Sequence, residues 1–344
     1  MGDFVGLEPM TWDNFPTDAA ITSVSLNPDA TEVAAGLGDG TVLVRGLTDT
    51  SGKPDIAELR GHKSEIIGLD FVLGGRELVS AERDGVLMIW TPVARGKWQC
   101  SQKISTGSPI GGFSVTPDAK HCVTWATDTQ SISAWDLQKG TTSGQFSGPN
   151  QETFQHVAIS HEGRLLAAAY PKTGGSGVLI WDVAEQKVIQ DLSPGIDSII
   201  DVSISSDGQM LACAGTAGVA VFSLGDFQRR LMVPGDYPRD AALNPDGGLL
   251  AISATQFDVV RLWNVATNSE VATLRNMASP QRVAFSLNGQ ALVASGPQSV
   301  RVWNLAGDSE KIEFAVPGGG VPATQFSPDG LTLATASKDM KVRI

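Results

Sequence analysis

The sequence of 344 residues has few of the residues that build disulfide frameworks, metal sites and membrane spans. It contains three cysteines and four histidines, and none lie at the spacing of a metal-ligand motif. The longest apolar runs, such as residues 165–170, are too short to span a bilayer. We therefore expect neither a disulfide-stapled domain nor a transmembrane protein, and we expect no metal ion and no cofactor.

Basic residues are also few, and they are scattered. The formal net charge is −12, and no run of Lys or Arg is longer than a pair. Binding to nucleic acid or to an anionic membrane surface requires clustered basic side chains. The composition therefore predicts no nucleic-acid partner and no membrane insertion. The N-terminus lacks the basic and apolar regions of a secretory signal, so we expect a cytoplasmic location.

Turn residues, in contrast, are abundant and recur with a regular period. A turn of the form Ser/Asn-Pro-Asp-Gly, degenerate in several copies, follows a short alternating apolar stretch eight times. In such a turn, proline presets φ, aspartate bonds its own backbone and glycine tolerates a positive φ. The spacing, with a mean near 43 residues, predicts eight repeats. The turns end at residues 30, 75, 119, 163, 208, 247, 289 and 330.

Each turn is followed by an apolar strand, a second turn and another strand that usually ends in an aromatic residue. In the second repeat, residues 77–81 precede an Asp-Gly hairpin signal and residues 86–90, which end in Trp90. A lone four-stranded sheet cannot cover its own apolar faces, whereas radial stacking covers them. The recurring tryptophan is large enough to fill the gap between neighbouring sheets. The pattern predicts an all-β protein of four-stranded antiparallel sheets.

These features resemble the WD40 family, whose blades carry Gly-His, a Pro-Asp-Gly turn, an Asp-Gly hairpin and Trp-Asp at this period. The resemblance covers roughly residues 18–344. It implies an eight-bladed β-propeller forming one domain over residues 1–344, with a seven-bladed propeller plus a partial repeat as the alternative. The chain could also be part of a longer polypeptide.

The second repeat matches the buried hydrogen-bonded tetrad of the WD40 family. The resemblance implies that His62 lies between Asp84 and Ser80, and that Ser80 reaches the indole N–H of Trp90. The same residue types could be mistaken for a hydrolase triad. Their spacing, however, places them inside one blade, with Ser80 in a strand and not on an exposed elbow. We therefore expect a structural role.

The resemblance implies a non-catalytic scaffold that binds one or more proteins. Two alternatives remain open: a propeller attached to a kinase or cytochrome domain outside this chain, and a propeller enzyme such as a lactonase. The enzyme requires carboxylates or histidines around the central channel, and no repeated set of these types is evident at the start of the inner strands. His121, His156 and His161 are expected to be ordinary half-buried or solvated residues.

Loops on the narrow face of a propeller are the expected binding surface. There the loops entering the inner strands converge with the middle hairpins of the blades, and loops on a rigid scaffold tend to carry function. Tyrosine, phenylalanine and arginine are the residue types that anchor interfaces. The candidate partner-binding residues in these loops are Tyr237, Arg239, Phe257, Arg83 and Tyr170.

The two ends of the chain supply complementary parts of one blade. The final repeat stops at its third strand, residues 341–344, and lacks an outer strand. Residues 7–12 occupy the place of an outer strand before the first repeat. We therefore predict that residues 7–12 pair beside residues 341–344, which closes the ring and removes two unpaired edges.

Overall fold

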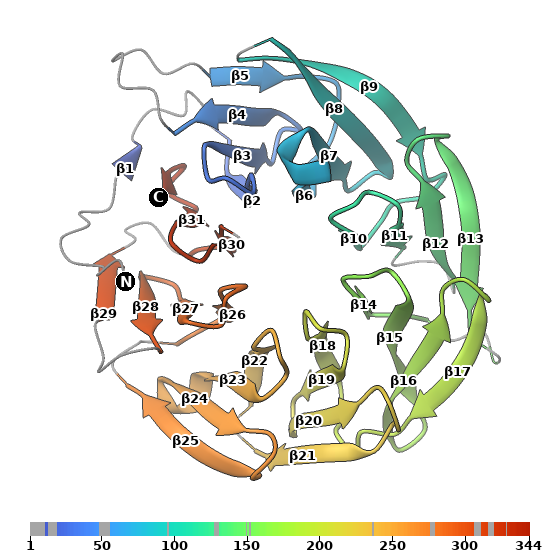
Figure 1. The fold of residues 1–344 in the computed structure, drawn as a ribbon, viewed down its shortest axis with the longest axis vertical. Coiled ribbons are helices and arrows are strands. Elements are labelled where there is room, and N and C mark those ends of the chain that lie inside the picture. The colour runs from blue at the N-terminus through green and yellow to red at the C-terminus, as the bar shows by residue number, and fades with distance from the viewer. Residues whose placement is uncertain are drawn as a thin grey trace.

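Alternating apolar residues between the predicted turns form short strands, and these pair into sheets. The computed structural model describes residues 11–12, 19–47, 56–94, 96–126, 131–148, 150, 153–235, 237–275, 279–305, 311–315, 320–327 and 329–344. The strands of these residues form eight four-stranded antiparallel sheets, arranged as a ring (Figure 1). The eight-bladed prediction is confirmed, and the seven-bladed alternative is wrong.

Blades are numbered here from the first complete sheet, with strands given from the centre of the ring outward. Blade 1 contains β2 (Ile21–Leu26), β3 (Glu32–Leu37), β4 (Val42–Gly46) and β5 (Ile56–Leu59). Blade 2 contains β6 (Ile66–Val72), β7 (Glu77–Glu82), β8 (Val86–Ala94) and β9 (Lys97–Ser105), with the 3₁₀ turn η1 (Leu73–Gly75) after β6. Blade 3 contains β10 (Gly112–Val115), β11 (Cys122–Trp125), β12 (Ser131–Asp136) and β13 (Thr141–Ser147). Blade 4 contains β14 (His156–Ile159), β15 (Leu165–Lys172), β16 (Gly175–Asp182) and β17 (Lys187–Leu192).

The second half of the ring follows the same order. Blade 5 contains β18 (Ile199–Ile204), β19 (Met210–Gly215), β20 (Gly218–Ser223) and β21 (Arg229–Pro234). Blade 6 contains β22 (Pro238–Leu243), β23 (Leu249–Ala254), β24 (Val259–Asn264) and β25 (Ser269–Leu274), with η2 (Thr255–Phe257) between β23 and β24. Blade 7 contains β26 (Arg282–Phe285), β27 (Ala291–Ser295), β28 (Ser299–Asn304) and β29 (Lys311–Ala315). Blade 8 contains β30 (Ala323–Phe326), β31 (Leu333–Ala336), β32 (Val342–Arg343) and β1 (Thr11–Trp12).

The hydrophobic core is divided among the interfaces between blades. Each of eight buried clusters joins side chains of two neighbouring blades. In β7, for example, Leu78 packs toward blade 1, whereas Val79 and Ala81 pack toward blade 3. Successive residues of a strand point to opposite faces of its sheet. Each blade therefore needs both of its neighbours to bury its apolar faces.

Blade 8 contains strands from both ends of the chain. Thr11 and Trp12 of β1 pair with Arg343 and Val342 of β32 in antiparallel register, and Figure 1 shows β1 beside the C-terminal strands. The predicted closure is confirmed for these two residues, whereas residues 7–10 lie outside the described residues. β1 is thus the outer strand of the last blade.

Strand alternation gives the ring two faces with different loops. The loops leading into the first strands and the hairpins between second and third strands lie on one face, the top face. The turns between first and second strands and the hairpins between third and fourth strands lie on the opposite, bottom face. The predicted partner-binding loops all belong to the top face.

Candidate functional site

A buried histidine network occupies blade 2, as the resemblance implied. His62 Nε2 lies 2.7 Å from Ser80 Oγ, and Trp90 Nε1 donates to the same oxygen over 2.8 Å. All three residues are buried. Desolvation lowers the pKa of His62 to about 4, although Glu82 opposes this shift. The imidazole is therefore neutral at neutral pH and has no exposed surface on which to meet a substrate.

The acidic residue beside His62 is Glu82, and the expectation for Asp84 is wrong. His62 Nδ1 lies 3.3 Å from Glu82 Oε2, which also accepts the backbone N–H groups of Lys63 and Ser64. Glu82 ends β7 with its side chain inside the blade, whereas Asp84 lies exposed in the hairpin turn. The longer glutamate side chain, two residues earlier, fills the position that an aspartate in the hairpin would otherwise reach.

Tyr237 and Phe257 are exposed on the top face of blade 6. Their exposed fractions are 62% and 52%, unusual for large aromatic side chains, which are mostly buried. Phe257 belongs to η2, and the guanidinium of Arg261 lies 5.4 Å from its ring centroid. Arg239, the second residue of β22, is also exposed. These three predicted residues lie on one blade.

Arg83 and Tyr170 lie apart from that group. Arg83 is exposed in the β7–β8 hairpin, where its Nη2 lies 2.7 Å from Glu65 Oε2. Tyr170 is only 6% exposed, packs in the cluster between blades 3 and 4 and donates its hydroxyl to Asp191. The expectation of an accessible Tyr170 is wrong, because the side chain lies within β15 and faces the neighbouring blade.

Four titratable side chains occupy one equivalent position on the inner strands of blades 4 to 7. Each directly precedes the inner-strand residue that pairs with the fourth residue of the second strand of its blade. The four residues are His156, Asp201, Asp240 and Arg282. The corresponding positions in the other blades hold Ser23, Gly68, Gly112 and Ala323. β14, β18, β22 and β26 are consecutive around the centre of the ring (Figure 1). We call these four residues the axial arc.

The axial arc was not predicted, although the sequence contains a signal for it. Each arc residue stands seven residues before the last residue of its turn, at 163, 208, 247 and 289. Across the eight repeats, this position holds four titratable residues and four small ones. His156 is half-buried, as expected, and burial together with the charge of Arg282 lowers its pKa.

Asp201 and Asp240 form a carboxyl pair within the arc. Burial and the neighbouring Asp240 raise the pKa of Asp201 well above its ordinary value. Burial also raises the pKa of Asp240, whereas Arg282 opposes that shift. Asp240 Oδ2 accepts the backbone N–H of Val283 over 2.9 Å, which favours its charged form. A hydrogen bond between the two side chains raises the pKa of Asp201 and opposes the rise at Asp240, as expected of two carboxyl groups that share one proton held on Asp201.

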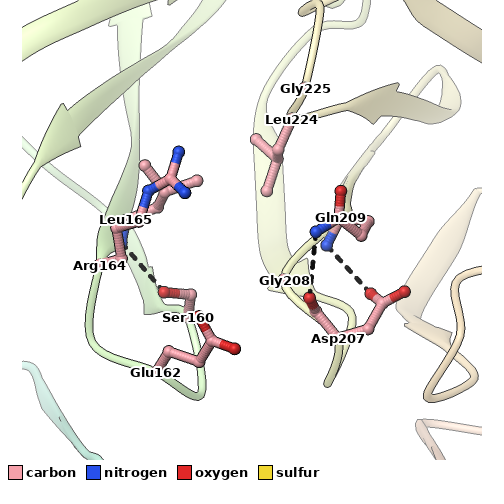
Figure 2. Close-up of a pocket in the computed structure, with 9 residues that line it drawn as sticks. All are labelled: Ser160, Glu162, Arg164, Leu165, Asp207, Gly208, Gln209, Leu224 and Gly225. Carbon is pink, nitrogen blue, oxygen red and sulfur yellow. Dashed lines mark hydrogen bonds between the residues drawn. The ribbon is translucent and has the colours of Figure 1, made fainter.

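A separate pocket lies on the bottom face. It has a volume of about 260 Å³ and lies between blades 4 and 5. Figure 2 shows turn residues of the two blades facing each other across it, including Arg164, Glu162 and Gln209. Ser160 and Asp207 hydrogen-bond the backbone of their own turns. Part of the lining therefore serves the turns of the repeat, and the pocket lies on the face opposite Tyr237 and Phe257.

Metal-binding clusters and membrane-spanning helices were the other features considered in the sequence, and neither occurs in the described residues. Within those ranges, no group of three or more His, Cys, Asp or Glu side chains could hold a metal ion. Among the same residues, no helix is both long and apolar enough to cross a membrane. Cys122 and Cys213 are buried, and Cys100 is exposed.

Comparison with curated proteins finds WD-repeat sequences. A family model described as "WD domain, G-beta repeat" matches residues 54–91 and 314–344, and the first match includes the histidine network. Pre-mRNA-processing factor 19 homolog 2 of Arabidopsis thaliana is 24% identical over 285 residues, which cover 81% of this chain and 53% of that protein. The WD repeat-containing protein 26 homolog of the same plant is 22% identical over 303 residues, covering 83% and 49%. The chain thus spans about half the length of these curated relatives.

Comparison with solved structures shows the same ring. Sqt1 of Saccharomyces cerevisiae has a TM-score of 0.80 at 15% identity, covering 97% of this chain and 96% of that one. Sqt1 of Chaetomium thermophilum bound to the N-terminus of the ribosomal protein L10 has a TM-score of 0.77 at 19% identity, covering 96% and 97%. At these identities the likeness shows the fold. With eight four-stranded blades, the histidine network and the matched repeats, the chain belongs to the WD40-repeat β-propeller family.

Proposed function

We propose that this protein is a non-catalytic scaffold that binds a segment of a partner protein on its top face. The observation that carries the proposal is the exposure of Tyr237 and Phe257 on one blade. Rigid aromatic side chains supply a large contact area at low conformational-entropy cost, and they are enriched among the residues that dominate binding energy.

The rigidity of the ring supports this proposal. The interfaces between blades bury the apolar core, and strands from both ends of the chain complete blade 8. A binding surface on such a frame needs little ordering on association, which conserves binding free energy. The complex of Chaetomium thermophilum Sqt1 with a ribosomal-protein N-terminus gives a precedent for this ring as a receptor for a protein segment.

The experiment compares protein capture by two matched double variants. Tyr237→Ser with Phe257→Ser removes the aromatic side chains of the top face. Leu287→Ser with Leu331→Ser removes two exposed apolar side chains, 48% and 58% exposed, from turns on the bottom face. The immobilised variants and the parent protein are exposed to lysate, and bound proteins are quantified by mass spectrometry.

The expected result is loss of specific partners from the top-face variant alone, with melting temperatures close to the parent value. Equal capture by all three proteins would overturn the top-face assignment. Loss of the same partners from the bottom-face variant alone would place the binding surface on the opposite side of the ring.

A further inference from the structure

Two exposed arginines stand on the top face, at the start of neighbouring inner strands. Arg239 precedes Asp240 in β22, and Arg282 precedes Val283 in β26. The 2.9 Å hydrogen bond from Val283 N to Asp240 Oδ2 ties these two strands together at that point. The backbones of Arg239 and Arg282 are therefore fixed next to each other near the centre of the ring.

Both guanidinium groups are free to bind a ligand. Arg239 and Arg282 are exposed, and within the described ranges neither forms an ion pair. Other exposed arginines do form such pairs: Arg60 with Glu58, and Arg83 with Glu65.

Asp240, one of the two carboxyl groups on which Arg282 acts electrostatically, already has hydrogen-bond partners. Asp240 accepts the Val283 N–H and a hydrogen bond from the protonated Asp201. Arg282 acts on both acids through charge alone. Its planar set of N–H donors, which matches a carboxylate in bidentate geometry, therefore remains available.

Tyr237 completes this surface, and the loop that holds it does not require a tyrosine. Tyr237 has a left-handed φ of 42°, three residues before Asp240. Ser198 and Ser279 hold the same conformation, with φ of 45° and 47°, three residues before their own arc residues in blades 5 and 7. A small polar residue thus meets the conformational need of this loop, and the exposed aromatic ring is an addition to it.

We propose that Arg239, Arg282, Tyr237 and Phe257 form a binding site for an acidic segment of a partner protein, in which the arginines bind carboxylates and the aromatic rings pack on its apolar side chains. The inference rests on the proposed function and adds the chemistry of the partner. Two arginines are too few for a nucleic acid, whose affinity depends on neutralising many phosphates.

Because the net charge is −12, binding of an acidic segment depends on where its carboxylates lie relative to the two arginines. Long-range repulsion of an acidic segment is screened beyond about 8 Å at physiological salt, so affinity depends on short-range contact. Acidic groups such as Asp197 and Asp258, both exposed on the top face of blades 5 and 6, disfavour carboxylates placed elsewhere. The segment is therefore oriented by attraction at the two arginines and by repulsion around them.

The test uses three fluorescent peptides. Each contains one phenylalanine and six copies of a single residue, which is glutamate, glutamine or lysine. Fluorescence anisotropy measures their binding to the full chain. We expect the glutamate peptide to bind, the other two to bind at least about tenfold more weakly, and added salt to weaken the glutamate complex. Tighter binding of the lysine peptide would overturn the proposal.

Variants with built-in structural precedent identify the contact residues. Arg282→Ala installs the residue type of the equivalent Ala323, and Arg239→Gln installs that of the equivalent Gln281, so both should fold. Each should raise the dissociation constant for the glutamate peptide about five- to tenfold. Arg164→Ala on the bottom face is the matched control and should leave it unchanged. Equal binding by all three variants would overturn the assignment.

The same reagents separate this inference from the proposed function. If the glutamate peptide displaces the partners captured through Tyr237 and Phe257, both proposals stand. If those partners are captured but neither the peptide nor the arginine variants affect them, the scaffold proposal stands and the acidic-segment proposal fails. A serine-phosphorylated peptide that binds while the glutamate peptide does not would also overturn it, in favour of a phosphorylated partner.

Discussion

At the scale of single residues, the repeat dictates where a tryptophan stands but not what it bonds. Trp90 donates to Ser80 and Trp135 to Thr124, each over 2.8 Å. The buried N–H groups of Trp263 and Trp303 find no partner among the described residues. In those blades the positions equivalent to Ser80 hold Ile252 and Ala294, which have no acceptor in the side chain. Blade 2 is therefore more completely hydrogen-bonded than blades 6 and 7.

Replacing His62 with alanine should destabilise the fold by about 1–3 kcal/mol, because the change removes the member of the buried network that joins Ser80 to Glu82. Urea unfolding followed by circular dichroism measures this loss. Asp84→Ala is the control: Asp84 is exposed, so its replacement should change stability by less than about 0.5 kcal/mol. A larger loss from Asp84→Ala than from Glu82→Ala would restore aspartate as the network's acid.

Giving Trp303 an acceptor should stabilise blade 7. Ala294→Ser places a hydroxyl at the position that Ser80 occupies in blade 2, within reach of the orphaned indole N–H. The expected gain in unfolding free energy is about 0.5–1.5 kcal/mol, the net contribution of one hydrogen bond. Cys213→Ser in blade 5 is the control, because it places a hydroxyl at the equivalent position of a blade whose closing aromatic residue, Phe222, has no N–H group, and it should give no gain. A loss at Ala294 equal to that at Cys213 would contradict the expectation.

At the scale of elements, neighbouring inner strands are joined by side chains as well as by packing. Asp240 of β22 bonds the backbone of β26. Gln325 of β30 accepts from Leu26 N in β2 and donates to Asp70 in β6, so one side chain links blades 8, 1 and 2. Burial raises the pKa of Asp70 to about 7. These polar links place titratable groups where blade meets blade.

The carboxyl pair between β18 and β22 predicts a stability that falls as pH rises. The pKa of Asp201 is higher in the folded protein than its ordinary value of 3.8. Its contribution is therefore fully present below that value and is lost as pH rises through the folded pKa. Asp201→Asn, which can still donate to Asp240 and does not titrate, should melt higher than the parent protein at pH 7, and the difference should shrink toward pH 4.

Melting curves of the two proteins between pH 4 and pH 9 measure this difference. The acid side of the curve also contains the contribution of His62, whose lowered pKa destabilises the fold as pH falls from about 6.5 toward 4 in both proteins. The comparison between variant and parent removes this shared effect. A constant difference in melting temperature across the range would show that Asp201 does not carry a proton in the fold.

At the scale of the whole molecule, the ring depends on its closure. β1 is the outer strand of blade 8 and pairs with β32. Deleting residues 1–14 removes β1 and leaves the edge of β32 unpaired, which should lower the melting temperature and promote aggregation. Deleting residues 1–10 keeps β1 and is the matched control. If both deletion variants melt like the parent protein, as measured by differential scanning calorimetry, the closing pair does not stabilise the ring.

The sequence alone determined the features that arise from local patterns. Turn residues every 39 to 45 positions, alternating apolar stretches and closing tryptophans predict eight blades, because turn geometry and strand alternation depend on a few adjacent residues. The same pattern located Tyr237 and Phe257 on the top face, whereas Arg239, expected in the loop before the inner strand, is the second residue of that strand. The fit of β1 to the last blade also followed from counting strands.

Only the tertiary structure decided which side chains meet. Glu82 and not Asp84 faces His62, because the length of a side chain and the path of its hairpin determine its reach. Tyr170 is buried because a neighbouring blade covers it. His156 and Arg282 are 126 positions apart in the sequence, yet lie on one arc because four blades repeat the same strand register around a common centre. Such contacts depend on the closure of the whole ring, and no local pattern contains that information.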